Sequence, residues 1–454
     1  MASSSLTTGP LPQHIRNIAL PMSIGFLFNT MYNVVDSYFA GKISTSALAA
    51  MALCFPVFFI ILAASQGLAR GASVLIANAI GSGDSEKESA LSGQVLSLGA
   101  LTSIFLMGIG LWSAEPLFRI LGASGAYLEL ATSYIHPIFI GTFFFMLTSM
   151  SNSILLAHGD SKSFSRVLVV GFFLNLILDP WFLYGGFGLP GMGIAGIALA
   201  TVLIQALGGF YLFAVVIRRG HVTMSCCQHL KPDWKTYREI LHQAIPAGFN
   251  MASIAVGFFV ITYYLKFYGE SAVAAFGVGT RIEQMALLPT IGLGAAIVAI
   301  VGQNNGAGKF DRVHQCVQLC IRYGFYLIVV ASISMYFLAT PLVRLFTDDL
   351  EVIQLGSKYI RIMAFIQWAY VMSFIHIGFL QAVKKPMYGF FEAVLRKIIL
   401  PLGLFYLVVN IMESELNAFW FSIVAINVVV TMVTVVYAQL KLKGCKEYKA
   451  PLEK

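Results

Sequence analysis

The stretch IALPMSIGFLFNTMYNVVDSYFA, residues 18–40, decides how this chain folds. It is long enough to cross a bilayer as one helix, and Asp36 is its only charged residue. A carboxylate at membrane depth costs about 2.5 kcal/mol or more and persists mainly where it faces protein or water. Helical spacing places Asn29, Tyr32 and Asn33 on the same face as Asp36. We therefore expect this face to line a polar interior rather than to contact lipid.

The rest of the chain has the same apolar character. Of its 454 residues, 58% are hydrophobic and only 11% are charged, and the mean hydropathy is +0.80. Soluble proteins carry about 25% charged residues, so the composition predicts an all-α, polytopic membrane protein. Runs of about 20 apolar residues predict about twelve transmembrane helices. These are expected at residues 16–40, 47–80, 93–113, 128–154, 163–184, 190–217, 238–266, 272–305, 320–343, 356–382, 388–410 and 416–440.

The two halves of the chain resemble each other at one ungapped offset of 225 residues. The offset pairs Ala19–Pro21 with Ala244–Pro246, and Gly67 with Gly292. It predicts two pseudo-symmetric six-helix lobes, residues 1–219 and 238–454, joined by a cytoplasmic linker at 220–237. Because six is an even number, both lobes have the same orientation in the membrane. Two-lobed repeats of this kind are common in transporters, although a channel or a structural membrane protein can also carry one.

Lysine and arginine residues are distributed unevenly between the two ends of these helices. We assign 21 of them, including Arg396 and Lys397, to the side that carries both termini, and 6 to the opposite side. Cytoplasmic loops are enriched in Lys and Arg, so both termini are predicted to be cytoplasmic. The net charge of +8 then reflects topology and contacts with membrane lipids, and we expect no nucleic-acid partner.

The six cysteines show no spacing typical of a zinc site or a disulfide framework. His221, Cys226, Cys227 and His229 lie close in sequence within the linker. We nevertheless expect no metal site there.

A second polar pair lies in the helix expected at 163–184. Asn175 and Asp179 are one turn apart on one face, and Pro180 frees a backbone carbonyl beside them. With Asp36, these groups predict a hard oxygen site that suits a proton or a sodium ion. Desolvation and a like-charged neighbour both favour the neutral form of either carboxylate. The alternative is that either acid is structural and is held by hydrogen bonds alone.

The second half of the chain lacks this acidic pair, because Asp36 aligns with Ile261 and Asp179 with Leu404. Packing alone does not require such a difference between the lobes, so the asymmetry favours transport. Glu283 is the possible acid of the second lobe. A local ion pair with Arg281, or a position at a helix end, explains Glu283 as well as a coupling role does.

The chain carries several motifs in a fixed order, and together they resemble the multidrug and toxic compound extrusion (MATE) transporters. The similarity covers nearly the whole chain, and the DinF-like branch fits best because the acidic pair is in the first lobe. The motifs are Pro21 followed by Asp36, Gly81-x-Gly83, Gly159-Asp160, Asn175-x-x-x-Asp179-Pro180, the set Gly191, Gly196 and Ala198, and Gly277-x-Gly279-Thr280-Arg281-x-Glu283.

This resemblance implies a drug:cation antiporter of the bacterial inner membrane. It implies that Asp36, Asn175 and Asp179 bind the coupling proton or sodium ion, with Thr201 as a hydroxyl partner, and that Pro21 is the hinge of the first helix. The second lobe lacks an Asp in its last two helices, unlike the NorM-like branch. The resemblance implies that Tyr134 and Asn152 line the substrate cavity, to which we add Asn29, Tyr32 and Asn33 from the polar stripe on the first helix.

We therefore predict a monomeric secondary active exporter of amphipathic, often cationic drugs. No enzyme activity, cofactor or resident metal is expected beyond the proton or sodium gradient, and the chain has no Gly-x-x-x-x-Gly-Lys-Ser/Thr phosphate loop. One alternative is a lipid-linked oligosaccharide flippase, which would need several Arg or Lys in its cleft. The cations expected at membrane depth are chiefly Arg70 and Arg281. The other alternative, a non-transporting receptor or scaffold, would not need Asp36 and Asp179 together.

Overall fold

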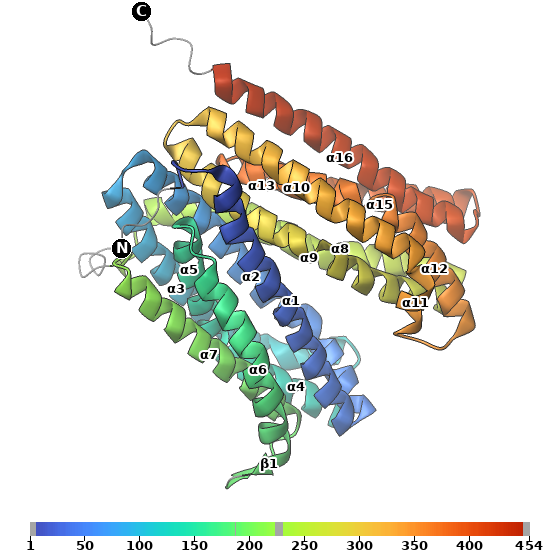
Figure 1. Cartoon of the computed structure of the whole chain (residues 1–454). Helices are drawn as coiled ribbons and strands as arrows, with labels where there is room; N and C mark the ends of the chain where they lie inside the picture. Colours follow the sequence, from blue (N-terminus) through green and yellow to red (C-terminus); the bar gives the residue numbers. More distant parts are fainter. Residues whose placement is uncertain (1–5, 187, 223–229, 448–454) are drawn as a thin grey trace, which may run out of the picture. The chain divides into compact units, whose positions relative to one another are not determined.

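The computed structural model describes residues 6–186, 188–222 and 230–447 and is built almost entirely of helices (Figure 1). The first half of the chain contains α1 Leu11–Ile43, α2 Thr45–Ser82, α3 Ser85–Ile120, α4 Gly125–Ile140, α5 Thr142–Ala157, α6 Lys162–Tyr184, the strands β1 Gly185–Gly186 and β2 Leu189–Pro190, and α7 Ile194–Arg218. The second half contains α8 Trp234–Leu265, η2 Lys266–Tyr268, α9 Glu270–Gly306, α10 Phe310–Phe337, α11 Ala339–Arg344, α12 Leu350–Ala364, α13 Gln367–Ala382, α14 Met387–Val394, η3 Leu395–Ile399, α15 Leu400–Tyr406, η4 Leu407–Ile411 and α16 Leu416–Glu447.

Up to twelve membrane spans can be formed from these helices. Within the described residues, ten helical segments are long and apolar enough to cross a bilayer, and two bent pairs complete the set. The pairs are α4 with α5, bent by 45°, and α12 with α13, bent by 51°. The prediction of about twelve transmembrane helices is therefore confirmed, but the helices expected at 128–154 and 356–382 are broken. At the first break, a Cβ on Gly141 would come within 2.4 Å of Val202 on α7, so a close helix contact accompanies the bend.

The internal repeat is visible element by element. The first residues of α2 and α9 are 225 positions apart in the sequence, and so are the first residues of α3 and α10. The bent pair α4–α5 maps onto the bent pair α12–α13 in the same way. The two halves therefore share one helical plan, as the sequence repeat predicts.

The described contacts divide the chain into two compact units. The N-unit comprises Ile24–Gly248, and the C-unit comprises Met1–Ser23 together with Phe249–Lys454. The chain passes from one unit to the other inside α1 and inside α8, in each case two residues after a proline, Pro21 or Pro246. The predicted lobe boundaries at 219 and 238 follow the repeat and stay a prediction.

Close contacts at glycines explain why α1 and α8 are each divided between the two units. In the C-unit, a Cβ on Gly292 of α9 would lie 2.3 Å from the carbonyl oxygen of Ala19 on α1. In the N-unit, a Cβ on Gly67 of α2 would lie 2.7 Å from Cα of Gly248 on α8. Glycine is thus required at both crossings, which are related by the repeat.

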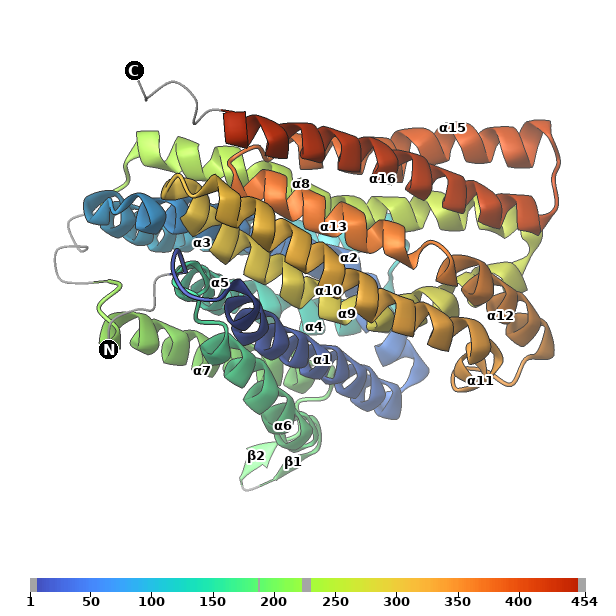
Figure 2. The ribbon, with the colours of Figure 1, turned by 45° about the horizontal axis from the view of Figure 1, so that its top comes forward.

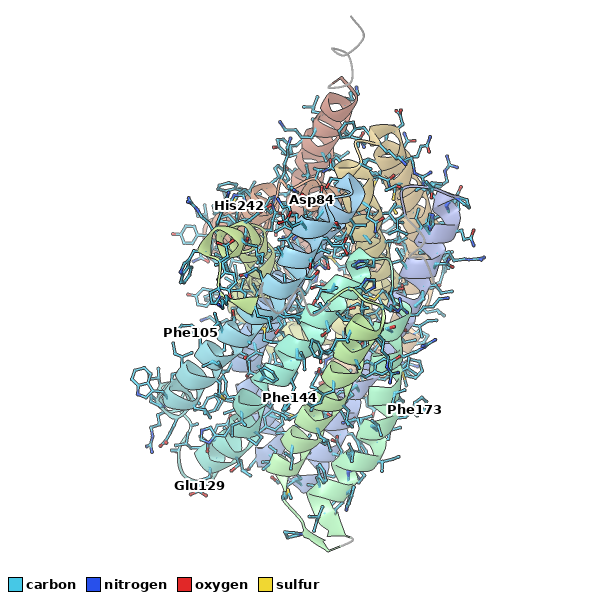
Figure 3. The ribbon with its side chains drawn as sticks, turned by 90° about the vertical axis from the view of Figure 1, so that its left-hand side faces the viewer. Asp84, Phe105, Glu129, Phe144, Phe173 and His242 are labelled. Carbon is cyan, nitrogen blue, oxygen red and sulfur yellow. The ribbon has the colours of Figure 1, made fainter. Side chains whose placement is uncertain are left out.

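Within the N-unit, α5, α6 and α7 pack side by side, and Figure 3 shows Asp84 and His242 at one end and Glu129 at the other. Within the C-unit, α13, α15 and α16 are neighbours (Figure 2). The C-unit core is rich in aromatic side chains, among them Phe276, Tyr359 and Trp420.

One expectation about charge is wrong. Arg396 and Lys397 were assigned to the cytoplasmic side, but they lie in the middle of the candidate span Met387–Ile411. Both belong to η3, the first of two π-helical turns in this span, of which η4 is the second. The cations at membrane depth are therefore more numerous than the apolar pattern predicted.

Candidate cation-coupling site

The two acids of the first lobe lie together inside the N-unit. Asp36 comes from α1, and Asn175 and Asp179 come from one face of α6. Asp36 is 6% exposed, and the other two are fully buried. The amide nitrogen of Asn175 donates to Oδ1 of Asp36 at 2.8 Å, and Asp179 interacts electrostatically with Asp36. The structure thus brings together the three residues that the sequence singled out.

Two further elements contribute a hydroxyl and a phenol. The hydroxyl of Tyr32 on α1 donates to Oγ1 of Thr201 on α7 at 2.9 Å, and Thr201 interacts with Asp36. Tyr134 on α4 is buried and interacts electrostatically with Asp36 and Asp179. Tyr32, which was predicted for the substrate cavity, therefore lies with the acids.

Several buried oxygen atoms of this cluster are poorly satisfied. Both carboxylate oxygens of Asp179 and the amide oxygen of Asn175 are buried without a well-aligned hydrogen bond from the described residues, although Asp179 lies near Asp36 and Asn175. Buried polar atoms are nearly always paired, so unsatisfied ones need an explanation. No basic side chain within the described residues forms an ion pair with Asp36 or Asp179. Two carboxylates without a cation are costly to bury unless a proton or a metal ion neutralises one of them.

The local sequence explains how the site is formed. Tyr32 packs with Phe172, Leu178 and Phe182 in an apolar cluster formed by the same helices that carry the acids. A Cβ on Gly196 of α7 would lie 2.5 Å from the carbonyl oxygen of Phe182, so this glycine allows α6 and α7 to approach closely. The neighbouring side chains are mostly apolar and offer few hydrogen-bond donors, so the carboxylates dominate the electrostatics of the site.

Three residues predicted for the substrate cavity lie outside the acidic cluster, and their role stays a prediction. Asn33 is exposed, and its amide nitrogen donates to the carbonyl oxygen of Asn29, one turn earlier, at 2.8 Å. Asn152 on α5 has a buried amide oxygen without a partner in the described part of the chain. Thus only Tyr32 and Asp36 of the polar stripe on the first helix enter the acidic cluster. Pro21 lies on the same helix but in the C-unit.

The C-unit has a different polar cluster. Glu283 is buried on α9 and interacts with Tyr359 and Gln367. Arg281 is exposed, and no ion pair joins it to Glu283 within the described residues, so the local ion pair considered for Glu283 is wrong.

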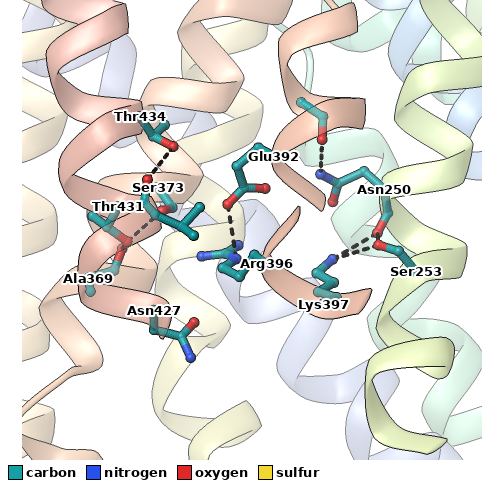
Figure 4. Close-up of polar contacts among 12 residues, drawn as sticks. Asn250, Ser253, Ala369, Ser373, Glu392, Arg396, Lys397, Asn427, Thr431 and Thr434 are labelled. Carbon is teal, nitrogen blue, oxygen red and sulfur yellow. Dashed lines mark hydrogen bonds and ion pairs between the residues drawn. The ribbon is translucent and has the colours of Figure 1, made fainter. Parts of the chain in front are cut away.

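Near the middle of the last-but-one span, Nε of Arg396 lies 2.9 Å from Oε1 of Glu392 (Figure 4). Nζ of Lys397 donates to the carbonyl oxygen of Asn250 at 2.9 Å and to Oγ of Ser253 at 3.0 Å. The cluster thus combines one acidic and two basic side chains inside the span. Sequence reasoning missed this cluster, although two adjacent cations within an apolar run are a visible signal.

Only part of the linker, for which no metal site is expected, belongs to the described residues. His221 belongs to the described residues, whereas Cys226, Cys227 and His229 lie outside them.

A repeated bundle of membrane-spanning helices, with a buried acidic pair in one half and two basic residues inside a span of the other, is typical of a multi-pass membrane transporter. Comparison with known proteins then gives its family. The MatE family model matches residues 21–181 and 246–407, one segment in each half, and the chain belongs to this family.

Individual relatives carry several names. The chain is 28% identical over 403 residues to the FAD transporter of Shewanella oneidensis, covering 88% of both chains. It is 26% identical over 358 residues to the probable multidrug resistance protein YoeA of Bacillus subtilis, covering 78% of this chain and 76% of the relative. Its fold matches the outward-facing structure of a multidrug resistance MATE family transporter of the MOP superfamily with a TM-score of 0.91, at 24% identity and covering 98% and 99% of the two chains.

Proposed function

We propose that the protein is an antiporter that exports amphipathic, cationic drugs in exchange for protons or sodium ions. One observation carries the proposal: Asp36 and Asp179 are buried together without a basic partner in the described residues. A proton or a sodium ion that enters the cluster relieves their repulsion, and its departure restores the negative charge. Names of multidrug transporters among the relatives support the choice of drugs as substrates.

The oxygen atoms of the site suit either coupling ion. Asp36, Asp179, the amide oxygen of Asn175 and the hydroxyl of Thr201 form a hard donor set that fits sodium. A proton needs only one of the two carboxylates. We propose both as coupling ions of the same site, in a protein of the bacterial inner membrane with cytoplasmic termini.

Transport by purified protein in liposomes tests this function. Ethidium movement is followed under an imposed proton gradient, then under a sodium gradient, for wild type and Asp179→Asn. The wild type should accumulate ethidium against its gradient, and the variant should lose accumulation while it still inserts and binds ethidium. Normal uphill movement by Asp179→Asn would reject the assignment. A matched control is Asp311→Asn, outside the acidic cluster at the start of α10 in the C-unit.

A second substrate class is favoured by a specific observation. Arg396 and Lys397 place two basic side chains inside a candidate span, and one relative is named a FAD transporter. We propose amphipathic anions with a pyrophosphate, such as FAD, as alternative cargo, because Arg and Lys bind phosphate through charge-assisted hydrogen bonds.

Counterflow experiments separate the two classes. Liposomes preloaded with unlabelled FAD should take up labelled FAD if anions are cargo, and Lys397→Gln should slow this exchange about tenfold or more. Lys443→Gln, at an exposed helix end, serves as the control. Ethidium counterflow without FAD counterflow would reject the anionic class.

A further inference from the structure

Three side chains outside the coupling site meet in the N-unit. Glu88 lies in the first turn of α3, His158 directly follows α5, and His221 lies just beyond the end of α7. One nitrogen or oxygen atom from each lies within 4.8 Å of the corresponding atoms of the other two. Two imidazoles and a carboxylate from three separate parts of the chain therefore lie close together.

The orientation of His158 is fixed by a backbone contact. Its Nδ1 lies 2.8 Å from the carbonyl oxygen of Ile154, which can only accept, so Nδ1 carries a proton. Its Nε2 faces Oε1 of Glu88 at 2.8 Å. This contact is a hydrogen bond, or an ion pair when the ring carries a second proton, and a metal ion bound between the two atoms would replace that proton. Histidine ligands of metals typically donate their other N–H to a backbone carbonyl, as His158 does.

His221 supplies an unpaired nitrogen. Its ring stacks on that of His158 with centroids 3.5 Å apart and planes inclined by 29°. Its Nε2 is buried and has no hydrogen-bond partner in the described residues. Arg219, two residues before His221, forms an ion pair with Asp160 at 2.9 Å and so holds this part of the chain in place.

We propose that Glu88, His158 and His221 bind a divalent transition-metal ion, with Zn²⁺ as the expected ligand. Two imidazoles and one carboxylate are a common zinc ligand set that leaves a fourth position for water, and imidazoles disfavour Mg²⁺ and Ca²⁺.

Two changes would complete the site. Zinc bonds of about 2.0–2.2 Å place tetrahedral ligand atoms about 3.4 Å apart. The contact between His158 and Glu88 must open by about 0.6 Å, and the His221 ring must rotate to aim its nitrogen at the ion. Bound metal would join α3, α5 and the start of the linker that follows α7.

Thermal unfolding with added ZnCl₂ tests the proposal. The protein is purified without a polyhistidine tag and carries Cys226→Ser and Cys227→Ser, because free thiols bind zinc independently. Micromolar Zn²⁺ should raise the unfolding temperature by several degrees, whereas Mg²⁺ should not. His221→Asn, His158→Asn and Glu88→Gln should each weaken zinc affinity about tenfold or more.

The matched control is His242→Asn, an exposed histidine of α8 in the same unit, which should leave zinc affinity unchanged. Cobalt gives a second readout that does not depend on stability: Co²⁺ should give the visible absorption of a tetrahedral site in the parent and not in Glu88→Gln. The proposal is overturned if the parent shows no zinc-induced shift, or if all three variants keep the affinity of the parent.

Discussion

At the scale of single residues, the acidic cluster depends on a few groups that are costly to bury. Asp36, Asn175 and Asp179 could be predicted because charged or amide groups are rare in apolar helices and helical spacing relates Asn175 to Asp179. The bond between Tyr32 and Thr201 could not be predicted, because it joins α1 to α7 and depends on how those helices pack. The partners of Glu283 were missed for the same reason.

Tyr32→Phe should loosen the cluster without removing an acid. Loss of the hydroxyl leaves Thr201 without its donor, so the free energy of unfolding should fall by about 1 kcal/mol. Coupled ethidium export should slow several-fold. Thermal unfolding and liposome transport check both effects.

Tyr38→Phe on the same helix provides the comparison, since Tyr38 is 58% exposed. Tyr38→Phe should change neither the free energy of unfolding nor the rate of coupled ethidium export. Equal behaviour of the two variants would mean that the bond between Tyr32 and Thr201 contributes nothing.

At the scale of elements, apolar run length predicted the spans and the repeat predicted their pairing. The bend between α4 and α5 was missed, because it coincides with a tertiary contact between Gly141 and Val202. The sequence also did not predict that α1 and α8 are each divided between the two units. The glycines that contact these helices, Gly67 on α2 and Gly292 on α9, appear in the sequence only as a pair aligned by the repeat.

Pro21→Ala should slow turnover about tenfold while ethidium binding persists. Proline removes a backbone hydrogen bond within α1 and allows the helix to bend close to the point where it passes between units. Ala restores the bond and stiffens that point. Transport rates and equilibrium binding, measured on the same preparation, check the prediction.

Pro246→Ala is the comparison, because Pro246 occupies the repeat-related position of α8, which carries no acid opposite Asp36. We expect a smaller effect on turnover. If Pro21→Ala transports at the wild-type rate, bending at Pro21 is not part of the cycle.

At the scale of the whole molecule, the two halves share a helical plan but differ in charge. The N-unit buries the pair Asp36 and Asp179, whereas the C-unit buries Glu392 beside the partly buried Arg396 and Lys397. Composition predicted the fold class because a chain with 11% charged residues must satisfy its backbone within helices when it enters lipid. The charge of the C-unit was misjudged, since Arg396 and Lys397 were taken for topology signals.

The predicted topology can be measured with single cysteines in a cysteine-free protein. An impermeant maleimide added to intact cells should label Leu189→Cys in the β1–β2 hairpin and should not label Ser85→Cys at the start of α3. Both positions are exposed, and Figure 3 shows the hairpin at the end of the N-unit opposite Asp84. Labelling of Ser85→Cys alone would place the termini outside the cell.

The central claim is that the charge of the buried acids drives export. The most direct measurement compares wild type and Asp36→Asn in liposomes, with ethidium accumulation recorded under separate proton and sodium gradients and ethidium binding recorded between pH 5 and 8. We predict that Asp36→Asn abolishes accumulation under both gradients, and that wild-type binding weakens as the pH falls, because protonation removes the negative charge that favours a cation. Accumulation by Asp36→Asn against an ethidium gradient, together with wild-type binding that is unaffected by pH and by sodium, would contradict the account and make Asp36 a structural acid.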